Sequence, residues 1–172
     1  MDMRQFLIES DTEFLREAAA LVDNRLDKLY GDVKVHPDPF GYGLIDSIDY
    51  VLGFGFVACQ TYVPTIVKWS DLDKREALKL GPRHRSGRPM IELVHACANY
   101  WKHNAEWALD SPRPREQITI DIIASLGVDT SKEYPMPDAL HQLLDPHPPR
   151  IKYLIPFLTQ WRDEVLACSK GG

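Results

Sequence analysis

The amino-acid sequence predicts an all-α protein, a single-domain helical bundle of four to five long helices that spans residues 1–172. Apolar residues recur every three or four positions in several long segments, which is the period of an α-helix. Glycine and proline gather between these segments, and no intervening stretch is long enough to separate two domains. A chain of 172 residues, 44% of them hydrophobic, also has the size and composition of one domain with a core.

The first helix is marked by its ends. Ser10 and Glu13 have the spacing of a capping box, which indicates a helix start. The helix should therefore run from Asp11 to about Tyr30, where Gly31 can end it.

The least polar segment, Leu44 to Trp69, predicts a buried helix. Gly53, Gly55 and Pro64 lie within it, and they leave a strand open as an alternative. Four further helices are expected from the same periodicity, at Asp71 to Leu80, Glu116 to Leu126, Asp138 to Leu144 and Arg150 to Ser169.

The segment from Arg88 to Leu109 is predicted to be the central buried helix. Pro89 suits a first helical turn, and apolar residues cover most of the helical circumference. The polar residues of the segment, with one exception, share a strip about 100° wide, and they are Glu92, His95, Asn99, Lys102, His103 and Glu106. A mostly buried helix with one polar strip is a candidate functional site.

Charge and cysteine content limit the class of protein. A net charge of −5 argues against a uniformly basic nucleic-acid coat but allows a local basic patch. Cys59, Cys97 and Cys168 are odd in number and far apart, which is typical of reduced thiols in the cytoplasm. No secretion signal is visible, and the longest strongly apolar run, Val51 to Cys59, is too short to span a bilayer. We therefore expect a cytoplasmic protein without membrane contact.

A metal site on the polar strip is not expected. His95 and His103 are eight residues apart, about 12 Å along a helix, which is too far for one ion. His103 and Glu106 have the spacing of paired helical ligands, but the sequence contains no second pair of this kind. A nucleophile elbow and a glycine-rich phosphate loop are also missing, and Cys97 falls on the apolar face. We expect no metal and no cofactor.

The strip does carry the residue types that general acid–base cleavage of RNA requires. Histidine can transfer protons to and from a ribose hydroxyl, lysine can stabilise phosphorane charge, and asparagine can orient the phosphate. His103, Asn99 and Lys102 lie within one helical turn, and His95 lies one turn before Asn99. These four residues are the candidate catalytic residues.

A basic cluster precedes the central helix. Arg83, Arg85 and Arg88 concentrate positive charge beside its N-terminus, where free N–H groups also favour anions. We expect these arginines to contact RNA phosphate, and a solvated surface loop is the alternative.

The segment Ala98 to His103, Ala-Asn-Tyr-Trp-Lys-His, resembles the active helix of HEPN domains, a superfamily of helical bundles common in prokaryotic defence and toxin–antitoxin systems. The motif of that family is an arginine, often followed by a polar residue, with a histidine four to six positions further on. Asn99 and His103 match the polar residue and the histidine, whereas Ala98 stands where the arginine belongs. Arg88 and His95 satisfy the bare spacing in a second register.

The resemblance implies a metal-independent endoribonuclease or, because the arginine is replaced, a degenerate RNA-binding form. It also implies a homodimer, since sites of this family are commonly composed across two copies. The alternative is a non-enzymatic immunity or antitoxin-type protein, which would bind a cognate toxin, antitoxin or other protein through surface complementarity.

Overall fold

The computed structural model describes residues 3–108 and 110–168, and within these ranges the protein is entirely helical, with no strand. The all-α class predicted from the sequence is therefore confirmed. Seven α-helices and two 3₁₀ turns follow one another in the described ranges: α1 (Met3–Val35), α2 (Leu44–Lys68), α3 (Lys74–Ala77), α4 (Met90–His103), the turn Asn104–Glu106, α5 (Pro114–Ala124), α6 (Pro135–Leu144), the turn Ile151–Leu154 and α7 (Ile155–Cys168).

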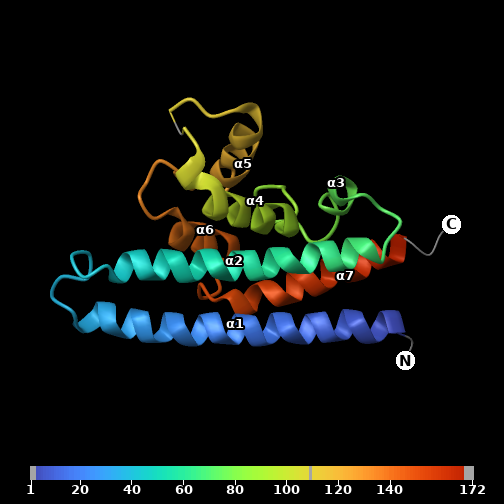
Figure 1. The fold of residues 1–172 in the computed structure, drawn as a ribbon, viewed down its shortest axis with the longest axis horizontal. Helices are drawn as coiled ribbons and strands as arrows, with labels where there is room; N and C mark the ends of the chain where they lie inside the picture. The colour runs from blue at the N-terminus through green and yellow to red at the C-terminus, as the bar shows by residue number, and fades with distance from the viewer. Residues whose placement is uncertain (1–2, 109, 169–172) are drawn as a thin grey trace.

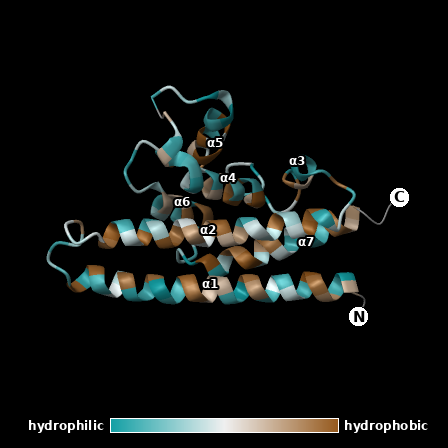
Figure 2. Cartoon of the chain, in the orientation of Figure 1, coloured by the Kyte–Doolittle hydropathy of each residue, from teal (hydrophilic) through white to brown (hydrophobic). Residues whose placement is uncertain are grey.

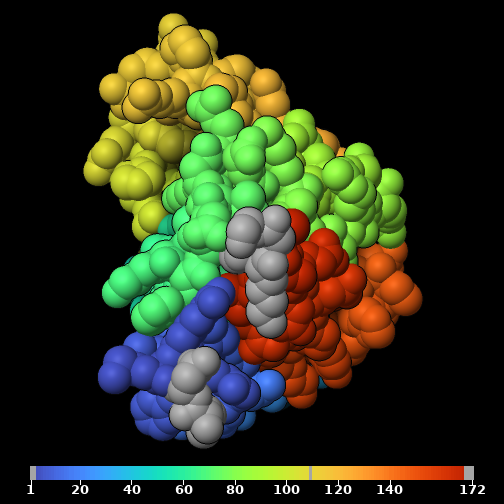
Figure 3. Space-filling model, turned by 90° about the vertical axis from the view of Figure 1, so that its right-hand side faces the viewer, coloured from blue at the N-terminus to red at the C-terminus, as the bar shows by residue number. Residues whose placement is uncertain are grey.

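The helices are arranged around α2. Helix α1 lies along one side of α2 in the opposite direction, and α4 crosses the other side (Figure 1). Helix α7 packs against α1, α2 and α4, and α5 lies on the outer side of α4. Seen from one end, α1 and α7 form the base of the molecule, and the segment from α3 to α5 rises above them (Figure 3).

The apolar character of α2 follows from this position. Among the described residues, α2 is the one helix long and apolar enough to cross a bilayer, and half of its most apolar window is buried inside the protein. Its buried side chains, among them Leu52, Phe56 and Val63, pack against the surrounding helices. The apolar character of α2 is therefore that of a helix buried in the core.

The two glycines of α2 permit close helix packing, and the segment is a helix rather than the strand left open by the sequence. A Cβ atom on Gly53 would overlap the ring of Trp101 from α4. A Cβ atom on Gly55 would press on Ile151 and Val22. Pro64 is accommodated inside the helix with its side chain exposed.

Several helix ends differ from the sequence-based expectation. Helix α1 begins at Met3 rather than Asp11, so Ser10 and Glu13 lie inside the helix and do not mark its start. Helix α1 continues through Gly31 to Val35, because this glycine is exposed and costs the helix only about 1 kcal/mol. The expected helix from Asp71 to Leu80 is reduced to the four residues of α3, whose start is capped by the Asp73 carboxylate. Ser169, the expected end of the last helix, lies outside the described residues.

The central segment is also shorter than expected. Helix α4 begins at Met90 rather than Arg88 and ends at His103, after which the chain tightens into the turn Asn104–Glu106. Glu106 therefore lies beyond the α-helical strip, and Leu109 lies outside the described residues. Most of α4 is buried, as its apolar circumference predicts.

Candidate functional site

The polar strip of α4 emerges between α2, α3 and α5. His95 and Asn99 are half-buried there, whereas Lys102 and His103 are exposed at the C-terminal end of the helix. Because the rest of α4 is packed against the core, the backbone that carries these side chains is firmly held.

A chain of hydrogen bonds joins α2 to this strip through Gln60. Lys102 Nζ donates to Gln60 Oε1 at 2.6 Å, and Gln60 Nε2 donates to Asn99 Oδ1 at 2.8 Å. The same Gln60 nitrogen lies 3.3 Å from the backbone oxygen of His95. Asn99 Nδ2 then lies 3.1 Å from His95 Nδ1. The order is thus Lys102, Gln60, Asn99, His95, with each group donating to the next.

The direction of this chain determines the tautomer of His95. An ammonium group can only donate, so Gln60 presents its oxygen to Lys102 and its NH₂ group to Asn99. Asn99 must then present its own NH₂ group to His95, whose Nδ1 is the acceptor. The proton of the neutral imidazole is therefore on Nε2.

His95 is held in its neutral form. Burial, together with the positive charges of Lys74 and Lys102, lowers the pKa of His95 from 6.5 to about 4. Its Nε2 atom is buried and has no hydrogen-bond partner among the described residues. The ring consequently offers an unsatisfied N–H donor, which is costly unless a ligand provides an acceptor.

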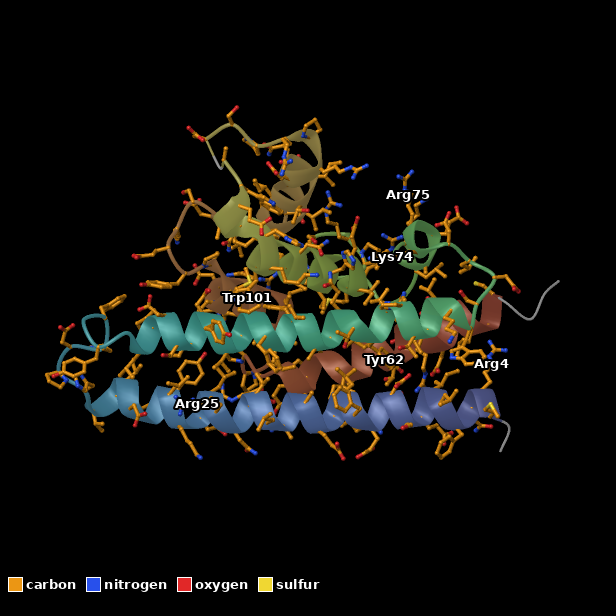
Figure 4. All side chains as sticks on the ribbon, in the orientation of Figure 1. Arg4, Arg25, Tyr62, Lys74, Arg75 and Trp101 are labelled. Carbon is orange, nitrogen blue, oxygen red and sulfur yellow. The ribbon has the colours of Figure 1, made fainter. Side chains whose placement is uncertain are left out.

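His95 lines a hollow of about 430 Å³ between α3, α4 and α5. One wall is formed by Lys74, Arg75 and Lys79, in and after α3. The opposite wall is formed by the apolar side chains Ile118 and Ile122 of α5. Figure 4 shows Lys74 between α3 and α4, whereas Arg75 extends away from α3.

A second hollow, of about 750 Å³, continues along α4 toward its C-terminus. Asn99 and Thr119 line both hollows, so the two form one groove. We call this the α4–α5 groove; its second part is lined by Asn99, His103, Trp107, Arg113, Pro114, Arg115, Glu116 and Thr119.

Positive charge predominates in the α4–α5 groove. Its acidic side chains, Glu92 and Glu116, are each paired with an arginine, at 3.2 Å from Arg88 and 2.5 Å from Arg113. The ion pairs of the described residues do not include Lys74, Arg75, Lys79 or Arg115. Burial and the nearby charge of Lys102 lower the pKa of Lys74, which is the expected result of gathering cations without a counter-ion.

The structure divides the predicted site residues into two groups. His95, Asn99 and His103 line the α4–α5 groove, whereas Lys102 lines neither hollow and is connected to Asn99 through Gln60. The arginine cluster is largely engaged elsewhere. Arg85 pairs with Asp145 and Gln142 near α6, and Arg83 donates to the backbone oxygen of Gly87.

Arg88, which together with His95 gave the alternative alignment to the HEPN motif, pairs with Glu92. It therefore lies beside the groove rather than on its floor. Neither Arg83 nor Arg85 lines the two hollows of the groove. The expected phosphate contacts of these arginines are therefore not supported by a shared location with His95 and His103.

Gln60, Lys74 and Lys79 were not predicted from the sequence. Gln60 is the one amide side chain within the apolar helix α2, and a buried polar residue in such a segment is a signal that it contacts another helix. Lys74 and Lys79 carried no distinctive spacing, because α3 is only one turn long. Their role depends on tertiary placement.

The geometry suits anion binding more than metal binding. The described residues contain no group of three or more His, Cys, Asp or Glu side chains that could hold a metal ion. The chain matches no protein-family model, no curated protein and no solved structure.

Proposed function

We propose that the α4–α5 groove binds the phosphate backbone of RNA without cleaving it. The observation that carries this proposal is the wall formed by Lys74, Arg75 and Lys79, which are absent from the ion pairs of the described residues, beside the neutral N–H donor of His95. Phosphate oxygens accept hydrogen bonds and carry the opposite charge, so both features favour the same ligand.

The length of the groove supports a polymer rather than a single small anion. Its two hollows extend from α3 to the C-terminal end of α4, and Arg115 adds a cation at the far end. A strand of RNA presents successive phosphates to such a row of cations. Trp107, half-exposed in the second hollow, offers an aromatic surface on which a base can stack.

The choice of RNA rests on the resemblance between Ala98 to His103 and the active helix of HEPN domains. In this protein, Ala98 is fully buried and provides no charge for a phosphorane. Both polar atoms of the Asn99 amide group are already engaged, by Gln60 and by His95. Such a site has cations that favour phosphate and lacks most of the groups that cleavage needs.

The proton-transfer groups of the strip support binding over catalysis for the same reason. Because the pKa of His95 is lowered to about 4, its ring is neutral at neutral pH. The lone pair on its Nδ1 atom already accepts a hydrogen bond from Asn99. His103 is the remaining histidine in the groove, and Glu106 is its ion-pair partner at 3.9 Å. A single exposed histidine lacks the second proton-transfer group and the charge stabilisation that rapid cleavage requires.

The proposal is tested by fluorescence anisotropy with an end-labelled single-stranded RNA of about 20 nucleotides at low salt. We expect wild-type protein to bind and Lys74→Ala/Lys79→Ala to bind about tenfold more weakly, since this variant removes two cations that face phosphate. Lys34→Ala/Lys152→Ala is the matched control, because it removes the same charge from exposed positions on α1 (Figure 1) and on the turn Ile151–Leu154, outside the groove. Equal weakening by both variants would contradict a binding site in the groove.

The same samples distinguish the competing functions. Metal-independent cleavage of the RNA that disappears in His103→Ala would show the nuclease form and refute binding alone. Absence of any RNA binding, with capture of a partner protein by the wild type, would favour the immunity or antitoxin-type alternative.

A further inference from the structure

A row of exposed apolar side chains runs along α1 beside its contact with α2. Leu7, Phe14 and Leu21 follow one another at intervals of seven residues and are 39%, 65% and 68% exposed. Val35, which is 82% exposed, lies fourteen residues after Leu21, and Lys28 occupies the position between them. A seven-residue apolar repeat on a straight helix is the seam along which two helices pack. We call this row the α1 stripe.

The α1 stripe is continuous with the exposed face of α2. Phe54 of α2 is 48% exposed and Tyr50 is 65% exposed. The two helices enclose a notch of about 40 Å³ next to Phe14, whose lining includes Ala18, Ala58 and the buried Leu15 and Tyr62. Figure 2 shows apolar residues recurring along both helices. Exposed apolar area of this extent on two neighbouring helices is typical of a protein–protein contact.

The sequence of α1 is complementary to itself when it is read in the opposite direction. Ala18 is at the centre, with Phe14 four residues before it and Leu21 three residues after it. Asp11 lies seven residues before Ala18, and Arg25 lies seven residues after it. A twofold axis at Ala18 thus places Asp11 against the partner's Arg25 and places Phe14 within one residue of the level of the partner's Leu21.

The charges on this face of α1 favour a second copy of the chain as the partner and an antiparallel orientation of its α1. Asp11 and Arg25 project from the same side of α1 as the stripe, and the ion pairs of the described residues include neither of them. Antiparallel packing pairs these opposite charges twice, once on each side of the axis, whereas parallel packing would place Asp11 against the partner's Asp11. Small Ala18 at the axis allows the two helices to approach closely.

We infer that the protein forms a symmetric homodimer in which α1 packs antiparallel on α1 of a second copy, centred on Ala18. The described part of α1 is about 50 Å long, so the seam can extend over several helical turns. This face is on α1 and α2 and leaves the α4–α5 groove open (Figure 1). The inference is independent of what the groove binds.

Light scattering coupled to size-exclusion chromatography at micromolar concentration tests the dimer. Wild-type protein should have twice the 19.7 kDa mass of the chain, and Phe14→Glu/Leu21→Glu should have the mass of one chain. Phe40→Glu is the matched control, because Phe40 is exposed to the same degree, 66%, in the loop before α2. This control should remain dimeric. Circular dichroism should be unchanged in all variants, since the replaced side chains are exposed.

Charge reversal tests the antiparallel register. Asp11→Arg alone and Arg25→Asp alone should each weaken the dimer about tenfold, because each disrupts two symmetry-related pairs. The double variant should recover wild-type affinity, since it restores both pairs with the charges exchanged. A wild-type monomer at tens of micromolar, or a double variant as weak as the single ones, would overturn the inference.

Discussion

Asn99 holds His95 in a single tautomer. Its Nδ2 atom donates to His95 Nδ1 across 3.1 Å, and Gln60 fixes the orientation of the Asn99 amide group by donating to its oxygen. Because Gln60 is itself oriented by Lys102, a residue of α2 controls which nitrogen of a histidine on α4 carries the proton.

This relationship makes the tautomer of His95 depend on Gln60. In the wild type, NMR spectra that correlate the ring protons and nitrogens should show His95 protonated on Nε2 alone at neutral pH. In Gln60→Glu, the carboxylate cannot donate to Asn99, so the amide is free to turn and the Nδ1–H tautomer should become populated. An unchanged Nε2–H tautomer in this variant would mean that the chain of hydrogen bonds does not fix the ring.

The stability of the protein should depend on the titration of His95 in a definite direction. The pKa of His95 is lowered to about 4 in the folded protein, so the unfolded chain takes up a proton near pH 6.5 while the folded protein does not. The contribution of neutral His95 to the free energy of unfolding is therefore complete above pH 6.5, and it declines as the pH falls toward 4. Allowing for the partial exposure of the ring, we expect a decrease of about 1 to 2 kcal/mol in the free energy of unfolding.

Urea unfolding at a series of pH values measures this contribution as the difference in free energy of unfolding between wild type and His95→Asn. Burial raises the pKa of Asp49 to about 6, which changes the stability in the opposite direction as the pH falls. Both proteins contain Asp49, so this effect cancels in the difference. The advantage of the wild type over His95→Asn should shrink between pH 6.5 and 4. A difference that stays constant over this range would contradict a neutral buried His95.

Two glycine substitutions should change stability in opposite directions. Gly53→Ala should destabilise the protein by about 1 to 3 kcal/mol, because the added Cβ would overlap the Trp101 ring at the crossing of α2 and α4. Gly31→Ala meets nothing within 4 Å on the exposed side of α1 and should stabilise it by about 0.5 to 1 kcal/mol. Chemical unfolding of both variants measures these effects, and stabilisation by Gly53→Ala would show that the two helices do not pack closely there.

The three cysteines should differ sharply in reactivity. Burial raises the pKa of Cys59 and of Cys97 to about 12, so neither forms the thiolate that reacts with iodoacetamide, whereas Cys168 is exposed. Mass spectrometry after brief labelling at pH 8 should find one modified cysteine in the native protein and three after unfolding. Cys168→Ser should abolish native labelling, and modification of Cys97 in the folded state would be inconsistent with a packed α4.

The sequence predicts the fold of this protein better than its site. Apolar periodicity locates α2 and α4 because both are packed on most of their circumference, and it also places His95, Asn99 and His103 on one strip. Helix ends are less predictable, since Gly31 is tolerated within α1 and α4 tightens into a 3₁₀ turn at Asn104.

The missing parts of the site come from segments distant in the sequence. Gln60 contacts Asn99 across 39 residues, and no local pattern in α2 indicates this partner. Arg85, which the sequence placed with a phosphate cluster, pairs with Asp145 across 60 residues instead. Such contacts depend on how the helices cross, which residue spacing within one helix does not specify.

The salt dependence of RNA binding tests the central proposal most directly. Removing one lysine that neutralises a phosphate should reduce the slope of log K against log salt by about 0.7 for a single strand. Isothermal titrations of single-stranded RNA at several salt concentrations should therefore give a slope for Lys74→Ala/Lys79→Ala that is shallower than wild type by about 1.4, with the Lys34→Ala/Lys152→Ala control unchanged. Equal slopes for wild type and Lys74→Ala/Lys79→Ala would contradict phosphate binding in the α4–α5 groove.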